Sequence, residues 1–527
     1  MLTPSQVEDY AQRAAAAFDD LELDILTDIA RRIAKADYMT EGAQWQAERA
    51  QALGANRKHL AERMERLMAA AAPHVAVIFA QAMLDAEEQD NRFYRAAGQP
   101  EPEGIGTSAV AQQIVQSGYR RTMNTLYNLT QTRALMNNHN LPVAVQEQLG
   151  RMLDKGHMDV ATGAFSYDQI VRRGIKELAA EGVDAITYPS GHTDKLETVI
   201  LRAMRTGINQ TATDISQHNA NTMNVDVMEL SAHGGARTGD GGQDFTNHSW
   251  WQGKLVSLSG QPGYLTLKDI GLGDVRGFAG ANCRHNWHPY WPGISKPAYT
   301  QAMLDDYNAP KFPYNGQMLT EEQADRRQRA LERQIRRWKR EYVLAKETGQ
   351  TDLQNNAAGR VADARGRLND FLQQTGRQKQ QLRETVPGFG RSEASSAVWA
   401  ARRLQAEQNN AILIENLRTA GNLPQKAQIH LTPKGLDLAE LSFDDTHVNQ
   451  ERQHHISEAQ AKAFIQQAAI SVTVWNGRFE RYYSQNGVAY IDLLKKEIRT
   501  AYGKAEYDAS TQALMEALKQ HGLFRKH

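Results

Sequence analysis

Cysteine is almost absent from this sequence: one residue, Cys283, occurs in 527. A single cysteine cannot form an internal disulfide, which excludes a small secreted scaffold held by cross-links. The composition fits a reducing compartment, or an assembly whose stability comes from packing. A chain of this length predicts about three domains of roughly 150 residues each, enough to bury apolar cores.

The sequence also lacks an excess of either charge. It has 61 Lys and Arg residues and 61 Asp and Glu residues, so its formal net charge is zero. This balance excludes a chain-wide basic field for nucleic acid, although local patches remain possible. With 41% hydrophobic and 23% charged residues, the composition predicts a globular protein rather than a disordered one.

Leader, membrane and nucleotide motifs are missing as well. The first residues show no basic segment followed by an apolar one, so we expect no signal peptide. The apolar stretch from Ala69 to Met83 is interrupted by Pro73 and His74, and a bilayer span needs about 20 residues, so a buried helix is favoured. Neither a Walker motif nor a dinucleotide-binding glycine loop is present. We therefore expect no cofactor and no membrane partner.

What the sequence has in abundance is helix-forming residues. Leu21, Ile25, Ile29 and Ile33 recur at four-residue steps, a spacing typical of one buried helix face. Gly- and Pro-rich breaks and shifts in composition divide the chain, and we predict a predominantly helical α+β protein in five parts. These are a helical N-terminal region (1–225), a Gly/Trp/His-rich α+β core module (226–293), a Pro/Tyr-rich arm (294–316), a helical segment (317–422) and a C-terminal α+β domain (423–527).

The arm is predicted to be extended because prolines and tyrosines alternate along it. After it, a long helical stretch is predicted from Thr320 to about Leu382, and it carries a dense basic patch. Two interpretations of this patch stay open: a solvated helix face with opposite charges one turn away, or contact with phosphate or an acidic partner. The patch consists of Arg336, Arg337, Lys339 and Arg340.

The last hundred residues differ in composition from the helical segment before them. The β-branched run Ile470–Trp475, the Asn-Gly turn signal at 476–477 and the segment Phe479–Ser484 predict a β-hairpin. A second pair of strands, Tyr490–Asp492 and Glu497–Thr500, and a final helix at about 509–520 complete a separate small α+β domain.

Rare residues gather between Ser231 and Gly293. This window holds the one cysteine, four of the sixteen histidines and four of the eight tryptophans. Sulfur and imidazole suit zinc, with Cys283, His285 and His288 as weak candidates, but the spacing matches no standard finger. The alternatives are a packed, Gly-rich core, or a Cys283 nucleophile with a histidine as its base and Asp244 or Asp274 as the orienting carboxylate.

The order of these residues carries a resemblance. Ser-Ala-His-x-Gly-Ala-Arg, His-x-x-Trp-Gln-Gly-Lys and Asn-Cys-Arg-His-x-x-His-Pro resemble the phage minor capsid protein 2 family, similar in role to Mu F-type head proteins. The resemblance covers roughly residues 1–310 and includes the Tyr-x-Ser-Gly turn at 188–191 and the helix at 202–212. One departure is a longer loop between Arg237 and His248. The signature residues are His233, Arg237, His248, Trp251, Gln252, Gly253, Asn282, Cys283, Arg284, His285 and His288.

The resemblance implies a structural protein of the virion, synthesised in the host cytoplasm. It implies a few copies near the portal that assist head morphogenesis and the packaging or ejection of DNA. The implied partners are the portal and other capsid proteins. The basic patch at 336–340, if it contacts phosphate, adds phage DNA as a partner.

Family members of this kind often carry a fused C-terminal module that resembles barnase/EndoU/RelE-like nucleases. An RNase that works without metal needs an acid, a base and cations for the phosphate. The resemblance implies that His454 or His455 would be the acid or base, and that Arg478 and Arg499 would hold the phosphate of RNA. Ser484 and Thr500 would orient it, with Tyr482 also on the strands. The alternative is a purely structural domain.

Overall fold

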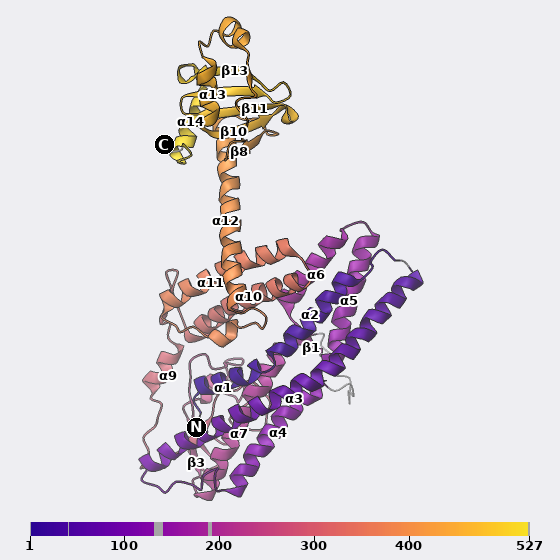
Figure 1. Cartoon of the computed structure of the whole chain (residues 1–527). Coiled ribbons are helices and arrows are strands. Elements are labelled where there is room, and N and C mark those ends of the chain that lie inside the picture. The colour runs from indigo at the N-terminus through magenta and orange to yellow at the C-terminus, as the bar shows by residue number, and fades with distance from the viewer. Residues whose placement is uncertain (1, 41, 131–140, 188–191, 525–527) are drawn as a thin grey trace. The chain divides into compact units, whose positions relative to one another are not determined.

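The computed structural model describes residues 2–40, 42–130, 141–187 and 192–524. The chain forms two compact units, Met1–Ala401 and Arg402–His527, and the boundary between them falls within helix α12 (Arg391–Ala420) (Figure 1). The Tyr-x-Ser-Gly turn at 188–191 lies outside the described residues.

The first unit is built around a bundle of long helices. Thr3 caps the first of them with a reciprocal hydrogen-bond pair to Gln6, and proline occupies its first turn. Leu21 and Ile25 of the predicted apolar face are buried, as are Ile29 and Ile33, which confirms the periodicity. Helices α3, α4 and α7 pack along one another (Figure 1). The helices are α1 (Pro4–Ala16), α2 (Asp19–Lys35), α3 (Gly42–Ala96), α4 (Ala109–Thr130), α5 (Leu141–Ala161), α6 (Tyr167–Glu181) and α7 (Leu196–Thr222).

Helix α3 contains the apolar stretch noted in the sequence. Pro73 interrupts the apolar pattern but not the helix, which continues over 55 residues. By length and composition, Gln44–Ala96 is one segment of the described chain that could cross a membrane. A core helix of a bundle meets the same criterion, and Met68 and Phe79 of α3 are buried among the neighbouring helices.

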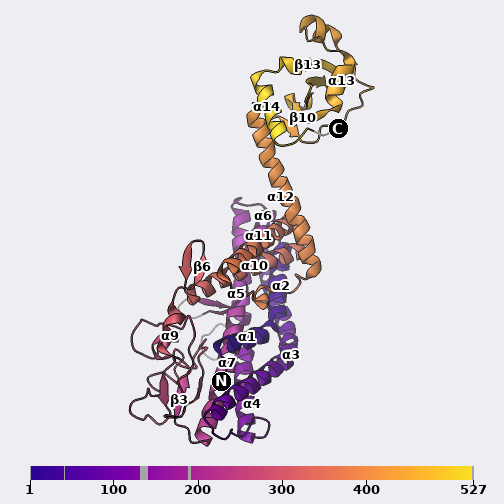
Figure 2. The ribbon, with the colours of Figure 1, turned by 90° about the vertical axis from the view of Figure 1, so that its left-hand side faces the viewer.

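The Gly/Trp-rich module forms a small sheet beside the bundle. Strand β3 (Val227–Leu230) is central, with β4 (Leu255–Ser257) and β5 (Trp287–Pro289) antiparallel on either side of it. A short helix, α8 (His248–Trp251), and long loops complete the module, which lies on one side of the helices (Figure 2). In a separate two-stranded sheet, β1 (Asp184–Thr187) pairs antiparallel with β2 (Thr193–Lys195).

The arm at 294–316 is not extended throughout, so that prediction is wrong. Thr300 caps a helix, α9 (Gln301–Asn308), by accepting a hydrogen bond from the N–H of Met303. The segment then turns at residues 315 and 316, both with positive φ, to form the hairpin of β6 (Phe312–Tyr314) and β7 (Gln317–Leu319).

The long helical stretch after the arm is divided. Gly349, with a φ of 72°, ends helix α10 (Glu321–Glu347), and α11 (Thr351–Thr375) returns along it. Thr320 caps α10 at the predicted start. The short turn η1 (Gln381–Glu384) follows α11 and contacts α10.

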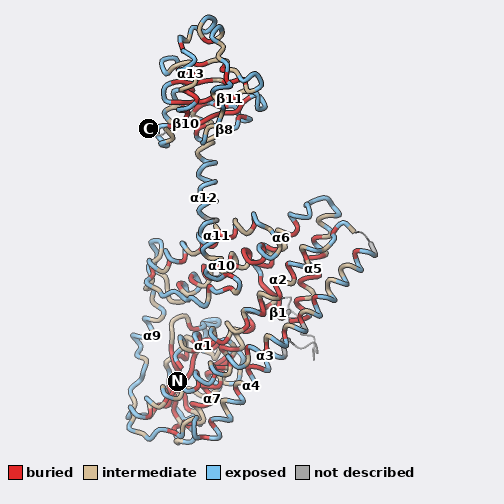
Figure 3. The backbone as a smooth tube through the Cα atoms, viewed as in Figure 1, coloured by how far each residue is buried: buried red, intermediate tan, exposed pale blue. Residues whose placement is uncertain are grey.

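The second unit is a six-stranded sheet with strand order β8-β10-β11-β12-β13-β9. The predicted hairpin around residues 476–477 is confirmed, and so is the final helix. Tyr482 packs into a core with α13 and Tyr483 into a core with α14, on opposite faces as alternation requires. Buried residues run through the strands of this sheet (Figure 3). The elements are β8 (Gln428–His430), β9 (Ser442–Phe443), η2 (Thr446–Glu451), α13 (Glu458–Gln466), β10 (Ala468–Val474), η3 (Trp475–Gly477), β11 (Phe479–Ser484), β12 (Gly487–Asp492), β13 (Glu497–Gly503), η4 (Lys504–Glu506) and α14 (Ala509–Gln520).

Candidate functional site

The loop from Ala279 to Asn286 is fixed onto helix α7 by side chains of that helix. The Asn209 amide donates to the carbonyl of His285 at 2.8 Å, and the Gln210 amide donates to the carbonyl of Ala279 at 2.9 Å. Buried backbone carbonyls need such partners, because an unpaired one is costly. The polar residues of α7 therefore hold the loop that carries the Asn-Cys-Arg element.

The three residues of that element take part in three different environments. Asn282, in a left-handed conformation with a φ of 59°, accepts a hydrogen bond of 2.6 Å from Arg205. Cys283 is buried among histidines. Arg284 lies near Glu8, whose charge opposes the fall that burial causes in the pKa of this arginine. The loop thus joins the histidine cluster to the charged interface between helices.

The cysteine has two imidazole neighbours. The Sγ atom of Cys283 lies 3.8 Å from Nδ1 of His248 and 3.7 Å from Nδ1 of His285. His288, predicted as a ligand together with Cys283 and His285, is not in this cluster. Its Nε2 lies 3.3 Å from a carboxylate oxygen of Glu229, and its ring stacks on Phe93.

On each imidazole, the Nε2 atom, which points away from the sulfur, is hydrogen-bonded to an oxygen. Nε2 of His248 is 2.8 Å from the carbonyl oxygen of Arg276, and Nε2 of His285 is 3.2 Å from Oε1 of Gln252. Burial lowers the pKa of His248 to about 4, so this imidazole is neutral at pH 7. The ring of Trp251 packs against both histidines, at 4.5 and 4.7 Å between centroids.

The nucleophile hypothesis finds no support in this geometry. Burial raises the pKa of the Cys283 thiol to about 11, and a thiolate is the reactive form. Asp244 is hydrogen-bonded to Thr246 and Asp274 to Arg276, so neither carboxylate orients a histidine.

The other signature residues position the loops around the cluster. The guanidinium of Arg237 donates to the carbonyls of Arg276 and Ala281, at 3.2 and 2.9 Å. Gly253 has a φ of 70° and lies against Leu304, where a side chain would be strained and crowded. The ring of His233 lies 4.4 Å from that of His285.

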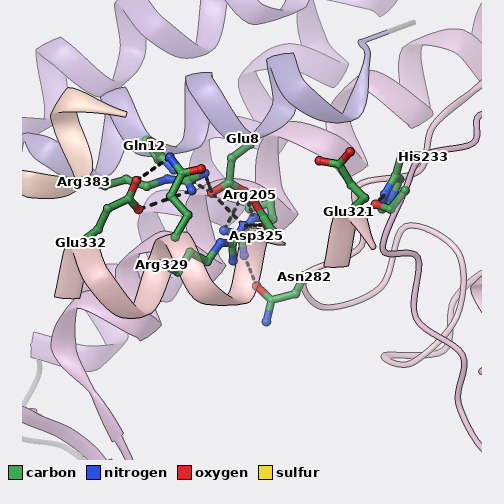
Figure 4. A network of polar contacts seen from close by, with 12 residues as sticks. Glu8, Gln12, Arg205, His233, Asn282, Glu321, Asp325, Arg329, Glu332 and Arg383 are labelled. Atoms are coloured by element: carbon green, nitrogen blue, oxygen red, sulfur yellow. Dashed lines mark hydrogen bonds and ion pairs between the residues drawn. The ribbon is translucent and has the colours of Figure 1, made fainter. Parts of the chain in front are cut away.

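A second cluster, which sequence reasoning missed, is centred on Glu8 (Figure 4). Arg205 of α7 and Arg383 of η1 donate to the Glu8 carboxylate at 2.9 and 3.2 Å, and Arg329 of α10 lies 3.7 Å from it. Burial would raise the pKa of Glu8, but the three guanidiniums together lower it to about 2. We call Glu8, Arg205, Arg329 and Arg383 the Glu8 cluster. Its members come from separate regions of the chain, so no local pattern could reveal it.

A cavity of about 280 Å³ adjoins the Glu8 cluster. Its charged lining is mixed rather than basic, because carboxylates alternate with the guanidiniums. The charged lining residues are Glu8, Asp19, Glu197, Arg205, Arg329, Glu332, Arg333, Arg336 and Arg383.

The cations of the basic patch at 336–340 are buried or half-buried. Arg336 pairs with Glu197 at 2.5 Å, and Arg340 pairs with Glu22 at 2.6 Å. Lys339 is buried and donates to the carbonyl of Glu384, and Arg337 lies over the ring of Trp338. Two of the four cations therefore neutralise carboxylates on other helices, which the prediction of a solvated face did not include, whereas contact with phosphate stays a prediction.

Three of the cationic candidates of the second unit, Arg478, Arg499 and His454, are each paired with a carboxylate. Arg478 donates to Asp492 at 2.9 Å, and Arg499 donates to Asp444. Nδ1 of His454 is 2.6 Å from a carboxylate oxygen of Glu506. His455 is exposed, with a φ of 50°.

Two of these candidates lie at opposite ends of strand β11. Arg478 precedes strand β11 and Ser484 ends it, a separation of about 20 Å at 3.3 Å per residue. The hydroxyl of Tyr482 is used internally, on the carbonyl of Lys434, and that of Ser484 on the carbonyl of Gly487. Thr500 is half-buried on strand β13.

Comparison with known proteins identifies the class of protein. The model of the family described as phage minor capsid protein 2 matches residues 2–373, so the chain belongs to this family of phage structural proteins. The match reaches beyond the predicted limit of about 310 and takes in α10 and nearly all of α11.

Two relatives are both described as "Structural protein". The protein of Lactococcus phage LL-H is 26% identical over 288 residues, which cover 51% of this chain and 71% of the relative. That of Lactococcus phage mv4 is 30% identical over 117 residues, covering 21% of this chain and 86% of the relative. No solved structure matches the chain.

Proposed function

We propose that this minor capsid protein acts near the portal vertex of the phage head, where it contacts the portal and other capsid proteins and assists head morphogenesis and DNA packaging or ejection. The observation that carries the proposal is the family match over 2–373, which spans the bundle, the Gly/Trp-rich module and the α10–α11 pair. The ion pairs of the buried Glu8 link α1 and α7 of the bundle to α10 and to η1.

The test is removal of the gene for this protein from a phage that encodes it, followed by complementation from a plasmid. We expect heads to form with reduced DNA filling, counted by electron microscopy, and the complemented phage to recover. In the intact virion, asymmetric reconstruction should place the protein at one vertex. Copies spread over all capsid faces, or normal filling without the protein, would contradict the proposal.

The alternative is a head protein that also delivers an RNase-like effector in its second unit. One contact favours it: His454 and Glu506 form a surface acid–base pair with Tyr502 beside the ring. The test is incubation of RNA with the full chain and with its His454→Ala variant, and with His521→Ala, another exposed histidine of the second unit, as the control. Cleavage by the wild type and control but not by His454→Ala would support the effector; equal absence of cleavage would leave a structural domain.

A further inference from the structure

The histidines around Cys283 are held in defined tautomers. A carbonyl oxygen can only accept a hydrogen bond, so the Arg276 carbonyl requires the proton of His248 to be on Nε2. Gln252 accepts from the backbone N–H of His233 at 3.0 Å, which fixes its Oε1 as the atom that faces His285. The proton of His285 is therefore also on Nε2.

Both Nδ1 atoms consequently present lone pairs to the sulfur. The sulfur of Cys283 and the Nδ1 atoms of His248 and His285 face one another. When both histidines are neutral, the thiol carries the one proton available to these three atoms. The thiol can donate to one Nδ1 only, so the other buried nitrogen faces the sulfur without a donor. A buried polar atom without a partner costs about 1–3 kcal/mol. A cation between the three atoms would satisfy all of them at once.

The distances suit such a cation. In a tetrahedral zinc site the Zn–S bond is about 2.3 Å and the Zn–N bond about 2.0–2.1 Å, which places sulfur and nitrogen about 3.6 Å apart. The observed separations are 3.8 and 3.7 Å, and the three ligand atoms all lie within 4.8 Å of one another. The Arg276 carbonyl and Gln252 amide are the outer partners that metal-bound histidines ordinarily have.

We propose that Cys283, His248 and His285 bind one zinc ion through Sγ and the two Nδ1 atoms. Three protein ligands leave the fourth tetrahedral position to water, and His233 lies beside the site. The mixed sulfur and imidazole set favours zinc over magnesium or calcium, which take oxygen ligands. The ion would connect α8 to the Asn-Cys-Arg loop, which α7 also holds.

The test measures metal in the full-length protein, purified under reducing conditions and dialysed against a weak chelator. By elemental mass spectrometry we expect one bound zinc ion per chain in the wild type. Cys283→Ser and His248→Gln should each bind at least tenfold less zinc. His74→Gln, a change at an exposed histidine of α3, is the matched control and should keep its zinc. His288→Gln should keep it as well, which distinguishes the cluster from the ligand set predicted by sequence.

X-ray absorption of the wild-type protein makes the result independent of how the variants fold. We expect one sulfur at about 2.3 Å from zinc, with nitrogen at about 2.0 Å. Protein that is free of zinc and takes up none when zinc chloride is added would overturn the proposal. So would bound zinc with no sulfur neighbour, or zinc retained by both Cys283→Ser and His248→Gln.

Discussion

A single carboxylate, that of Glu8, makes a large contribution to the stability of this protein. Its side chain is buried and its partners lie on three other elements, so removing its charge leaves guanidiniums without a counter-ion. We predict that Glu8→Gln lowers the free energy of unfolding at pH 7 by about 3 kcal/mol, since breaking a buried ion pair strands its partners. Urea unfolding measures this loss. Glu62→Gln, at an exposed pair with Lys58, is the control and should change stability by less than about 0.5 kcal/mol.

The same carboxylate gives a pH dependence with a definite sign. The pKa of Glu8 is lowered from 4.5 to about 2 on folding, so its stabilising contribution is present above pH 4.5 and is lost as the pH falls toward 2. The difference in stability between wild type and Glu8→Gln should therefore shrink over that interval. A difference that stays constant from pH 7 to pH 2 would show that packing, not charge, accounts for the effect.

The histidine cluster shows which residue-scale signals the sequence holds. Side chains of an extended chain alternate, so 283, 285 and 287 face one way and 288 the other. Period-two reasoning could have removed His288 from the ligand set. His248 could not have been assigned in the same way, because only the packing of α8 against the loop brings it to Cys283. The Glu8 cluster was equally hidden, since its pairs are up to 375 residues apart.

Helices α4 and α7 approach closely through two reciprocal glycine–threonine contacts. Gly118 of α4 faces Thr211 of α7, and Gly207 of α7 faces Thr122 of α4. A Cβ atom at either glycine would overlap the threonine. We predict that Gly118→Ala lowers stability by about 1 kcal/mol, because overpacking of about 2 kcal/mol exceeds the gain of about 1 kcal/mol in helix propensity. Thermal unfolding measures the change.

The control for that substitution has the opposite expected sign. Gly54 lies in α3 with open space where a Cβ would be, so Gly54→Ala should stabilise the protein by about 0.5–1 kcal/mol. A loss of stability in both variants would mean that the close approach of α4 and α7 is not what makes Gly118 necessary.

Helix α10 illustrates why charge patterns predict elements better than they predict partners. Its caps and periodicity gave the correct start, but its basic residues face carboxylates contributed by α2 and α7. We predict that Arg340→Gln destabilises the protein by about 2–3 kcal/mol, and that it leaves any DNA affinity unchanged at every salt concentration tested by filter binding. Arg333→Gln, an exposed change on the same helix, should leave stability unchanged. If folded Arg340→Gln binds DNA more weakly and with less dependence on salt than the wild type, the result would support a contact between the basic patch and phosphate.

At the scale of the whole molecule, the two compact units have separate cores. The sequence predicted the type of secondary structure in both units, because periodicity and turn residues are local signals. It did not predict the division of α12 between the units, because a continuous helix carries no composition break there. The cores of the second unit draw on residues from Leu413 to Phe524, all within 402–527, so we expect this unit to unfold independently of the first.

If the two units unfold independently and only the first binds zinc, removal of the metal should destabilise the first unit alone. Zinc that binds only the folded first unit stabilises it by mass action, whereas the second unit contains none of the proposed ligands. In calorimetry of the full chain we expect two transitions, and a strong chelator should lower the midpoint of one by roughly 5 °C while the other stays fixed. Cys283→Ser should show the lowered midpoint without chelator and no further shift with it. If both transitions moved together, or if the chelator acted equally on Cys283→Ser, the effect would arise elsewhere than at the cluster of Cys283, His248 and His285.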